Sequence, residues 1–548
     1  MKRIVIIGGV AGGMSAATRL RRLDPDAQIT VLERSGHVSY ANCGLPYYVG
    51  GVIEDHDALL LQTPASLHAR FRLDVKVGHE VRSINSAAKT VEVKDLNSGQ
   101  EFTLEYDFLI LSPGASPIVP PLPGIDRALT LRTVEDVDRI ASAVAQSPKN
   151  AVVIGGGFIG LETAENLRHK NIPTTLVEAQ HQVLAPLDPE MASVVLEELR
   201  KHEIDVRLGS GIASVESDSV TLANGDVIAA DLVILAIGVK PDTSLAKSAG
   251  LKIGERGGIS VDEHNRTSDP AIYAIGDAVE KIDALDGSST LVPLANIANR
   301  QGRVIADHIM GRETRIVPTI GTAIVKVFDL AIAVTGWNEK RLKSIGKNFL
   351  AIHSHPGSHA GYYPGAKTMA LKLLVDRDTN LILGAQGIGR DGVDKRIDVI
   401  ATAMRAGLTA PELADLELAY APPFGSAKDP VNMLGYMAEN LLSGLTESVQ
   451  WHEIEQLKQD GATLVDVRSA NEFSQGSIDG AINIPVDELR EKMHTLPKDN
   501  VVVFCQVGQR GHTATVLLRE NGINAVNLDG GYLTFMSHSK HTLAFNRA

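Results

Sequence analysis

A glycine-rich pattern occurs twice in the chain, and this repeat limits the possible folds more than any other feature. RIVIIGGVAGGMSAATRL at 3–20 and AVVIGGGFIGLETAENL at 151–167 each join an apolar run of strand length, a glycine turn and a stretch of small residues. Strand, turn and helix in this order are what a dinucleotide-binding motif requires. The sequence therefore predicts two nucleotide-binding α/β units in one chain.

A second strand follows each glycine turn and ends in an acidic residue. QITVLER places Glu33 at one strand end, and PTTLVEA places Glu178 at the other. A carboxylate at that point can accept hydrogen bonds from a ribose diol. The alternative is a glycine-rich turn that binds nothing, and two complete copies of strand, turn, helix and acid argue against it.

The two glycine turns differ at one position. Gly155, Gly157 and Gly160 fill all three positions of the fingerprint in the second unit, so the backbone there can approach a pyrophosphate at the start of a helix. In the first unit Val10 stands at the middle position.

The composition is that of an ordinary globular protein. The 548 residues suffice for about three or four domains, and 44% of them are hydrophobic. The formal net charge of -13 argues against a nucleic acid or an anionic membrane surface as a partner. No apolar run reaches the roughly 18 residues of a membrane helix, and the start of the chain is unlike a signal peptide. We therefore expect a cytosolic protein.

The chain has only two cysteines, Cys43 and Cys505, which excludes a disulfide framework. Each thiol is either an inert buried group or a reactive one. Cys43 lies in SYANCGLPYY, with no second cysteine nearby. A single reactive thiol can store oxidation as a sulfenic acid, a persulfide or a mixed disulfide with a small molecule.

Roughly the first 445 residues resemble the pyridine nucleotide disulfide oxidoreductases, a family of flavoproteins. The resemblance rests on the two glycine turns and on YDFLILSPGASP (106–117), DLVILAIGVKPDT (231–243) and TSDPAIYAIGDAV (267–279). It implies that the first unit holds FAD, that the second holds NADH or NADPH, and that Asp277 contacts the flavin's ribityl chain. The residues placed at the cofactors are Gly8, Gly9, Ala11, Gly12, Gly13, Glu33, Arg34, Asn42, Cys43, Gly114, Gly155, Gly157, Ile159, Gly160, Glu178, Gly238, Gly276, Asp277 and Ala295.

Two of these positions have a physical argument of their own. Asp277 follows a short apolar strand, so its carboxylate should lie at the carboxyl edge of a sheet, where ligands bind; a plain turn aspartate is the alternative. No arginine or lysine follows Glu178 closely enough to bind a 2'-phosphate. We therefore expect NADH to be preferred over NADPH.

Residues 320–445 alternate strand-like runs with two helical stretches, at 394–407 and 429–444. The periodicity alone indicates an α+β domain. The family resemblance implies that this domain mediates dimerisation and that the protein is a homodimer.

The segment from Trp451 onward resembles a rhodanese domain in TLVDVRSANEFSQGSIDGAINIP, VVVFCQVGQRGHTATVLL and AVNLDGGY. A strand delivers Cys505 to a loop, with a helix expected from Gly511, so backbone N–H groups should point at the sulfur and favour a thiolate or persulfide anion. Only four residues separate Cys505 from Arg510, a loop suited to one sulfur atom rather than a phosphate. The loop residues are Gln506, Val507, Gly508, Gln509 and Arg510. Asp466 and Arg468 are predicted to belong to the framework, together with Ser469 and Glu472, which are expected to form a capping box at the start of a helix.

The predicted fold class is α/β, with two Rossmann-like dinucleotide-binding domains, an α+β dimerisation domain and an α/β rhodanese domain. We expect the FAD-binding domain at 1–115 and 245–320, the NAD(H)-binding domain at 116–244, the dimerisation domain at 321–445 and the rhodanese domain at 446–548.

Two subfamilies of these flavoproteins suggest different roles for Cys43. NADH peroxidases and water-forming NADH oxidases use a sulfenate and carry a histidine where this chain has Val10, which weakens that interpretation. Coenzyme A disulfide reductases and NADH-dependent persulfide reductases form a mixed disulfide instead, and SYANCGLPYY, GYYPGAK and YAPPFGSAKDPVN resemble that subfamily. This second resemblance places Ser15, Arg19, Arg22, Ser39, Asn42, Asn299 and Lys428 at coenzyme A, with Tyr420 and either Tyr362 or Tyr363 reaching the thiol from the other subunit.

Arginines near the first glycine turn support this expectation independently. Arg19 and Arg22 lie three residues apart on the predicted helix and so share one face, suited to phosphate groups. A merely solvated helix face is the alternative. The sequence departs from the subfamily at Phe71, where a basic contact is usual. Either Arg70 or Arg72 replaces that contact, or the contact is missing.

The sequence thus predicts an enzyme that uses FAD and NADH to reduce coenzyme A persulfide, polysulfide or coenzyme A disulfide. Its catalytic residues are Cys43, which forms a Cys43-S-S-CoA intermediate, Cys505, which passes on sulfane sulfur, and Tyr362 and Tyr420. The alternatives are an NADH oxidase or peroxidase, a mainly sulfurtransferase enzyme and a redox sensor without catalysis. HSHPGSHAG at 353–361 contains three histidines around a Pro-Gly turn, and we expect an exposed loop there and no metal.

Overall fold

The computed structural model describes residues 1–537, and the chain divides into two compact units. The first unit comprises Met1–His181 and His202–Thr319, and the second comprises Gln182–Lys201 and the chain from Ile320 onward. The end of the predicted rhodanese domain, 538–548, lies outside the described residues. Within residues 1–537, every helix is too short or too polar to cross a lipid bilayer.

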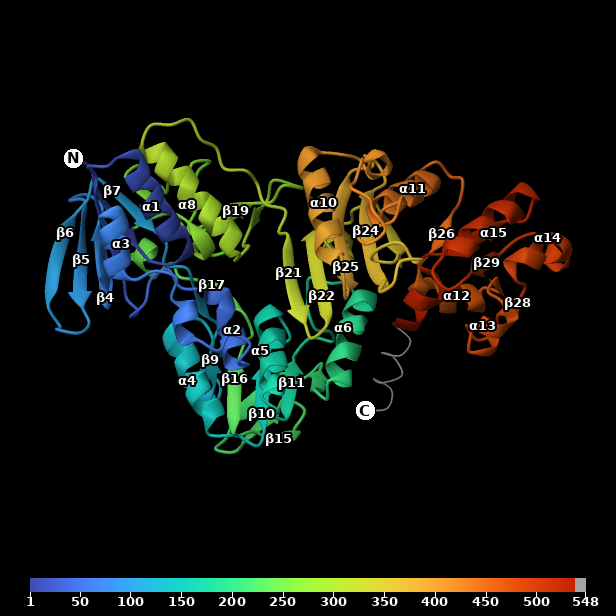
Figure 1. Cartoon of the computed structure of the whole chain (residues 1–548), viewed down its shortest axis with the longest axis horizontal. Coiled ribbons are helices and arrows are strands. Elements are labelled where there is room, and N and C mark those ends of the chain that lie inside the picture. Colours follow the sequence, from blue (N-terminus) through green and yellow to red (C-terminus); the bar gives the residue numbers. More distant parts are fainter. Residues whose placement is uncertain (538–548) are drawn as a thin grey trace. The chain divides into compact units, whose positions relative to one another are not determined.

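The first unit contains a five-stranded parallel sheet around the first glycine turn. In sheet order its strands are β18 (Ile272–Ala274), β7 (Phe108–Leu111), β1 (Arg3–Ile7), β2 (Gln28–Glu33) and β3 (Asp74–Val77). The central strands are apolar on both faces, as strands in a covered parallel sheet are. Helices α1 (Ala11–Leu23) and α8 (Ala295–Ile309) lie side by side against one face (Figure 1).

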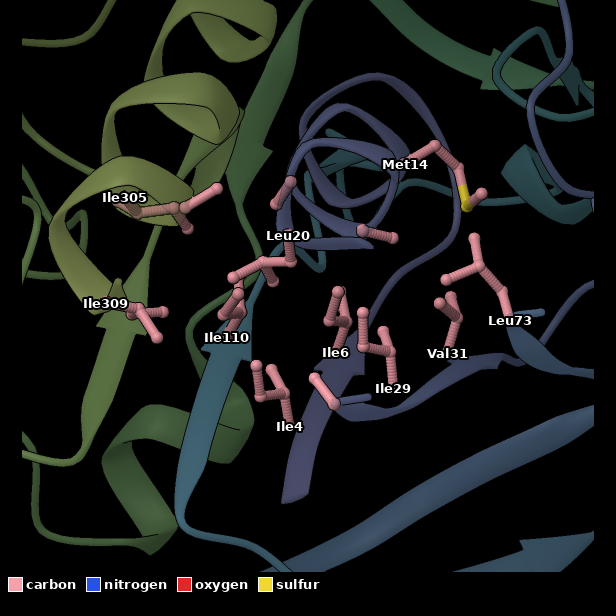
Figure 2. Packing of buried hydrophobic residues seen from close by; sticks show 14 of the residues in the cluster. Ile4, Ile6, Met14, Leu20, Ile29, Val31, Leu73, Ile110, Ile305 and Ile309 are labelled. Carbon is pink, nitrogen blue, oxygen red and sulfur yellow. The ribbon is translucent and has the colours of Figure 1, made fainter. Parts of the chain in front are cut away.

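Fully buried side chains fill the space between this sheet and the two helices. Figure 2 shows Ile6 of β1 together with Leu20 of α1 and Ile305 of α8, all with no exposed surface. Burying each of them contributes about 1.5–3 kcal/mol to folding. The helices can approach closely because of Gly302, where a Cβ atom would meet the carbonyl oxygen of Gly12 at 2.5 Å. Any larger residue at position 302 would force the helices apart.

A second five-stranded parallel sheet carries the second glycine turn. In sheet order its strands are β12 (Asp205–Leu208), β11 (Thr174–Glu178), β10 (Ala151–Ile154), β16 (Leu232–Leu235) and β9 (Leu129–Thr130). Helix α5 (Phe158–His169) follows β10, just as α1 follows β1. The predicted pair of nucleotide-binding units is therefore confirmed.

Smaller elements complete the first unit. Its antiparallel strands are β4 (His79–Asn85), β5 (Thr90–Asp95), β6 (Glu101–Glu105), β8 (Ala115–Pro117), β13 (Ile212–Val215), β14 (Ser219–Leu222), β15 (Val227–Ala229), β17 (Val239–Pro241), β19 (Lys281–Ile282) and β20 (Ser289–Thr290). Its other helical segments include η1 (Asn42–Gly44), α2 (Leu45–Val49), α3 (Pro64–Phe71), α4 (Val134–Ala145), α7 (Ser244–Ser248) and η4 (Gly276–Ala278).

The second unit begins with a five-stranded antiparallel sheet. In sheet order its strands are β21 (Ala323–Val327), β22 (Leu330–Gly336), β25 (Ile382–Gly389), β24 (Met369–Asp376) and β23 (Phe349–Ser354). Helices α10 (Val393–Ala406) and α11 (Pro430–Leu442) share a core with this sheet, in agreement with the α+β prediction. Helix α6 (Pro189–Lys201) also belongs to this unit, although in sequence it connects β11 to β12.

The prediction of an exposed histidine loop is wrong. His353 lies on β23, a strand that the sequence analysis did not anticipate, and its residue is only 1% exposed. His359 is buried as well, and His355 is half-buried. A run of apolar residues precedes His353 along β23 and carries it into the interior, because the whole strand pairs with β24.

A five-stranded parallel sheet forms the C-terminal part of the second unit. In sheet order its strands are β26 (Ser448–Val449), β30 (Ala525–Leu528), β29 (Val501–Phe504), β27 (Thr463–Asp466) and β28 (Ile482–Asn483). Its helices include α12 (Ile454–Gln459), α13 (Ala470–Ser474), α14 (Leu489–Lys492) and α15 (Gln509–Glu520). Helix α15 begins at Gln509, two residues before the predicted Gly511, so the loop after Cys505 is shorter than expected.

Candidate functional site

The first glycine turn connects β1 to α1 with the geometry that a bound phosphate needs. Gly8 has a φ of +99°, and a Cβ atom on Gly13 would meet the carbonyl oxygen of Gly8 at 1.9 Å, so neither position tolerates a side chain. The backbone N–H of Gly9 donates to Glu33 Oε2 at 2.8 Å, and that of Ser35 donates to Oε1 at 2.9 Å. Val10 precedes α1 and makes no side-chain cap, which leaves the first N–H groups of the helix for a ligand.

The second glycine turn repeats this arrangement. The backbone N–H of Gly156 donates to Glu178 Oε2 at 2.7 Å, and that of Gln180 donates to Oε1 at 2.8 Å. A Cβ atom on Gly160 would meet the carbonyl oxygen of Gly155 at 1.8 Å. Gly157 is different, because a Cβ atom there would meet nothing within 4 Å. The protein's own packing does not require a glycine at position 157, and the open space fits the approach of a pyrophosphate.

Asp277 lies where the sequence predicted, directly after β18 at the carboxyl edge of the first sheet. Its carboxylate accepts a hydrogen bond from Arg132 Nη2 at 2.9 Å. The carbonyl oxygen of Arg132 in turn accepts a hydrogen bond from Asn42 Nδ2 at 2.6 Å. Arg132 therefore links the predicted flavin contact to the loop that carries Cys43. It was missed from the sequence because it lies far along the chain from both residues.

Cys43 is exposed, on the short helical turn η1 that leads into α2. Surrounding atoms still desolvate its sulfur, and this burial, reinforced by the negative charge of Glu162, raises the pKa of Cys43 above its usual value. The guanidinium of Arg132 opposes this effect. The fraction of Cys43 that is present as thiolate thus depends on the charges of Glu162 and Arg132.

Glu162 is the second residue that the sequence analysis missed. It lies on the first turns of α5, and its Oε1 accepts a hydrogen bond of 3.1 Å from the hydroxyl of Tyr47 on α2. Burial raises the pKa of Glu162 to about 7, although the hydrogen bond from Tyr47 opposes the shift. A carboxyl group that titrates near neutral pH beside a thiol can hold or release a proton there. The only sequence signal was an acidic residue just after the third fingerprint glycine.

The predicted coenzyme A contacts on α1 have partners within the first unit. Arg19, predicted to contact coenzyme A, donates to Asp307 Oδ1 at 2.6 Å, so its charge is already paired within the protein. Arg22 is exposed and lies over the ring of Phe71, 5.4 Å from the ring centre. Phe71, where the subfamily usually has a basic residue, is therefore covered by a guanidinium.

Other predicted contacts of the first unit are placed as follows. The hydroxyl of Ser15 donates to the carbonyl oxygen of Asn299 at 3.1 Å, which brings two of the predicted substrate residues together. Ser39 has a φ of +50° in the turn before Cys43. Arg34 is exposed and lies 3.9 Å from Asp242. Gly114 and Gly238 flank the antiparallel pair β8 and β17, Gly276 begins η4, Ala295 begins α8, and Ile159 lies on α5.

The two predicted catalytic tyrosines lie together in the second unit. The hydroxyl groups of Tyr362 and Tyr420 are 2.8 Å apart and share a hydrogen bond. Both residues are exposed, Tyr362 to 76% and Tyr420 to 47%. Tyr363 instead packs edge-on against His359. Phe424 and Lys428 are exposed as well, so this surface presents aromatic rings and a cation to solvent.

Cys505 lies at the end of β29 and is fully buried. Gly508, with a φ of +91°, precedes α15 and turns the loop toward the helix. Arg510 donates to both carboxylate oxygens of Glu472, at 2.6 and 2.8 Å. This hydrogen bonding raises the pKa of Arg510, and the nearby sulfur of Cys505 contributes to the same shift. Glu472, predicted only as a helix cap, therefore also orients the arginine of the loop.

Arg468 and Asp466 form the framework beneath this loop. Arg468 donates to both oxygens of Asp466, at 2.7 to 3.1 Å, and to Gln506 Oε1 at 3.0 Å. Both charged residues are buried, and the guanidinium lies over the ring of Tyr532. The capping box of Ser469 at the start of α13 is present as predicted.

Three protein families match successive parts of the chain. Residues 2–302 match the pyridine nucleotide-disulphide oxidoreductases, residues 322–430 match the dimerisation domain of the same oxidoreductases, and residues 450–538 match rhodanese-like domains. The chain is 37% identical to coenzyme A disulfide reductase of Staphylococcus haemolyticus over 443 residues, which are 80% of this chain and 100% of that protein.

Solved structures that resemble the chain include two that span nearly all of it. The reduced CoADR-RHD of Bacillus anthracis is 49% identical with a TM-score of 0.96, covering 98% of each chain. The NAD-dependent persulfide reductase of A. fulgidus is 39% identical with a TM-score of 0.92, covering 97% of this chain and 100% of that one. The chain therefore belongs to the pyridine nucleotide-disulphide oxidoreductase family and carries a rhodanese-like domain at its C-terminal end.

Proposed function

We propose that this protein uses NADH to reduce the sulfur–sulfur bonds of small persulfides and disulfides, with coenzyme A persulfide and coenzyme A disulfide as the candidate substrates. The observation that carries the proposal is Cys43, an exposed thiol without a partner cysteine, beside a carboxyl group that titrates near pH 7. Its relatives named above reduce coenzyme A disulfide or persulfides. FAD at the first glycine turn and NADH at the second, when bound, supply the two electrons.

The chemistry at Cys43 follows from its lack of a partner cysteine. The thiolate attacks the coenzyme A sulfur of a persulfide, a Cys43-S-S-CoA bond forms, and hydrosulfide leaves. With coenzyme A disulfide as substrate, a coenzyme A thiolate leaves instead. Two electrons then break the mixed disulfide and regenerate the Cys43 thiolate and a coenzyme A thiolate, which takes up a proton. Glu162 is positioned to hold a proton near this sulfur while charge builds up on it.

We infer that the negative charge of Glu178 makes the second nucleotide site prefer NADH to NADPH. Both oxygens of Glu178 accept backbone hydrogen bonds, which fixes the carboxylate where a ribose of NADH would bind and a 2'-phosphate would be repelled. For the phosphate groups of coenzyme A, the exposed Arg22 is a better contact than Arg19, because Arg19 is already paired with Asp307.

We also propose a homodimer in which each subunit supplies tyrosines to the thiol of its partner. Exposed aromatic side chains such as Tyr362, Tyr420 and Phe424 favour burial against another protein surface. A shared hydrogen bond between the two tyrosine hydroxyls prepares one of them to donate a proton to a leaving sulfur. Free thiols at Cys43 and Cys505 suit a reducing compartment such as the cytosol.

The rhodanese-like domain is proposed to supply sulfur to the reductase. Cys505 accepts sulfane sulfur from a donor as a persulfide, and coenzyme A carries it onward. A mainly sulfurtransferase enzyme is a second candidate, because the loop from Cys505 to Arg510 is complete and its arginine is held by Glu472. An oxidase or peroxidase is disfavoured by Val10.

Anaerobic NADH consumption separates these functions. The wild type is supplied in turn with coenzyme A persulfide, coenzyme A disulfide, polysulfide, peroxide and, in a separate vessel, oxygen. We expect the wild type to consume NADH rapidly with the persulfide or the disulfide. Cys43→Ser should lose this activity, whereas Cys505→Ser should keep it when free coenzyme A persulfide is supplied. Fastest turnover with peroxide or oxygen contradicts the proposal. The mainly sulfurtransferase function is supported instead by two results together: the wild type shows no NADH-dependent reduction, and Cys43→Ser still transfers sulfur.

A further inference from the structure

A cluster of buried charges in the second unit lies outside the sites described above. His353 is its centre: Nδ1 lies 2.6 Å from Asp529 Oδ2, and Nε2 lies 3.0 Å from Glu190 Oε1. The backbone N–H of His353 also donates to Asp529, at 3.0 and 3.1 Å. A neutral imidazole has a single N–H, so only the protonated ring donates to both carboxylates at once. The geometry therefore calls for an imidazolium at position 353.

The charges around His353 explain how a buried ring can stay protonated. Burial alone would lower the pKa of His353, but the charges and hydrogen bonds of Asp529 and Glu190 outweigh it and raise the pKa to about 9. The ammonium of Lys372 acts in the opposite direction, and His355, whose pKa burial lowers to about 3, stays neutral nearby. Since folding raises the pKa of His353 above 6.5, the contribution of the protonated ring to the stability of the fold is complete below about pH 6.5. This contribution is lost as the pH rises through about 9.

Lys372 anchors the other end of the cluster. Its Nζ lies 2.5 Å from Glu190, 2.6 Å from Glu339 and 3.0 Å from Asp188, and the lysine has no exposed surface. The ammonium thus occupies the place among these three carboxylates that a metal ion could otherwise take. Asp188 is held further by Gln386, whose amide donates to it at 2.6 Å. Glu190 is therefore fixed, and it offers His353 an immobile acceptor.

Asp529 connects the cluster to the rhodanese-like domain. The next residue, Gly530, lies against His353, because a Cβ atom on Gly530 would meet the Cβ of His353 at 2.8 Å. Gly531 lies against the reactive loop, because a Cβ atom there would meet the carbonyl oxygen of Cys505 at 2.4 Å. The N–H of Tyr532 then donates to that same carbonyl oxygen at 2.8 Å. Two adjacent glycines thus separate His353 from the backbone of Cys505.

Three further contacts strengthen this junction between the antiparallel sheet and the parallel C-terminal sheet. The amide of Gln450 donates to Asp529 Oδ2 at 3.2 Å and to the carbonyl oxygen of Ala351 at 3.1 Å. His355 Nε2 lies 2.7 Å from the hydroxyl of Thr534. Strand β23 and His355, which directly follows it, are therefore bonded to residues on both sides of the glycine pair.

We propose that His353 is a positioning residue for sulfur transfer at Cys505, because its imidazolium, held between Glu190 and Asp529, fixes the glycine pair that supports the Cys505 loop. The inference rests on the proposed role of Cys505 as the persulfide carrier. It assigns a function to a histidine of the antiparallel sheet, outside the rhodanese-like domain itself. Misplacement of a reacting group by about 1 Å can cost about a hundredfold in rate, so a small shift of this support suffices.

The test compares His353→Gln, which keeps a polar side chain but loses the double donor, with His494→Ala, an exposed histidine of the same unit. Sulfur transfer is measured from thiosulfate to cyanide, in full-length enzyme without NADH. In this reaction the Cys505 thiolate takes the outer sulfur and sulfite leaves; cyanide then removes that sulfur as thiocyanate. We expect kcat to fall about tenfold or more in His353→Gln with KM nearly unchanged, while His494→Ala behaves as the wild type. NADH-dependent reduction of coenzyme A disulfide at Cys43 should stay within about twofold.

Two additional measurements separate positioning from general damage. Asp529→Asn keeps an acceptor for the backbone of His353 but removes the charge, and it should lower kcat in the same way even if His353→Gln folds poorly. The ratio of wild-type to His353→Gln kcat should be constant from pH 6.5 to 8 and fall toward one above about pH 9.5, because the wild type then loses its imidazolium. Unchanged sulfur transfer in both variants overturns the inference.

The experiment also distinguishes this inference from the proposed function. If the wild type shows no sulfur transfer that depends on Cys505, the proposed role of the rhodanese-like domain fails. Hydrogen exchange of residues 525–533 then decides the positioning claim alone: faster exchange in His353→Gln than in His494→Ala supports it, and equal exchange refutes it.

Discussion

Replacing Glu162 by glutamine should make Cys43 more acidic. Burial raises the pKa of Glu162 from 4.5 to about 7, which corresponds to about 3 kcal/mol in favour of its neutral form. The pKa of Cys43 lies above its usual 9.0, so Glu162 is ionised throughout the titration of the thiol and opposes it. Removing one nearby charge shifts a neighbouring pKa by about 1 to 3 units. Because Cys43 is exposed, we expect about one unit, or about tenfold more thiolate at a given pH below the pKa.

The assay is the rate of alkylation of Cys43 by iodoacetamide as a function of pH. A Cys505→Ser background leaves Cys43 as the only cysteine. The midpoint of the profile should move about one unit lower in Glu162→Gln, and Glu203→Gln, at an exposed glutamate of the same unit, should leave it unchanged. An unmoved midpoint, or one that moves higher, refutes the assigned coupling between the carboxyl group and the thiol.

Other changes test separate parts of the account. Lys372→Met leaves three buried carboxylates without their cation and should lower the free energy of unfolding by about 3–5 kcal/mol in urea titrations, whereas a loss below 1 kcal/mol contradicts the buried network. Gly160→Ala pushes a Cβ atom into a carbonyl oxygen and should weaken NADH binding at least tenfold by fluorescence titration, and unchanged affinity would show that the turn does not hold the nucleotide. Glu472→Gln frees Arg510 and should raise the KM for thiosulfate in sulfur transfer while the melting temperature changes little; an unaltered KM would assign Glu472 to helix capping alone.

Features that depend on local sequence were predictable. A glycine turn between a strand and a helix needs only a few neighbouring residues, and so does an acidic residue at the end of the next strand. Both copies of this arrangement form as expected, with Glu33 and Glu178 accepting the same pair of backbone hydrogen bonds. The capping box at Ser469 likewise depends on residues three apart.

Features that depend on distant residues were not predictable. Arg19 was predicted as a phosphate contact, but the sequence did not reveal its ion pair with Asp307, which lies 288 positions further along the chain. His353 was predicted to lie in an exposed loop because a Pro-Gly turn follows it closely, yet its two carboxylate partners are 163 and 176 positions away. Glu162 gave no signal beyond its place just after the third fingerprint glycine, since its pKa depends on burial and on Tyr47 from another helix. Tertiary packing alone brings these groups together.

The most direct test of the central claim is the mass of the peptide that contains Cys43. Cys43 is first freed by reduction and the reductant is removed; the enzyme is then mixed anaerobically with coenzyme A persulfide in the absence of NADH and quenched with acid. The account predicts a coenzyme A adduct on Cys43 that disappears when NADH is added and never forms in Cys43→Ser. A sulfenic acid on Cys43, or a free thiol with no adduct in enzyme that turns over the same persulfide once NADH is added, would contradict it.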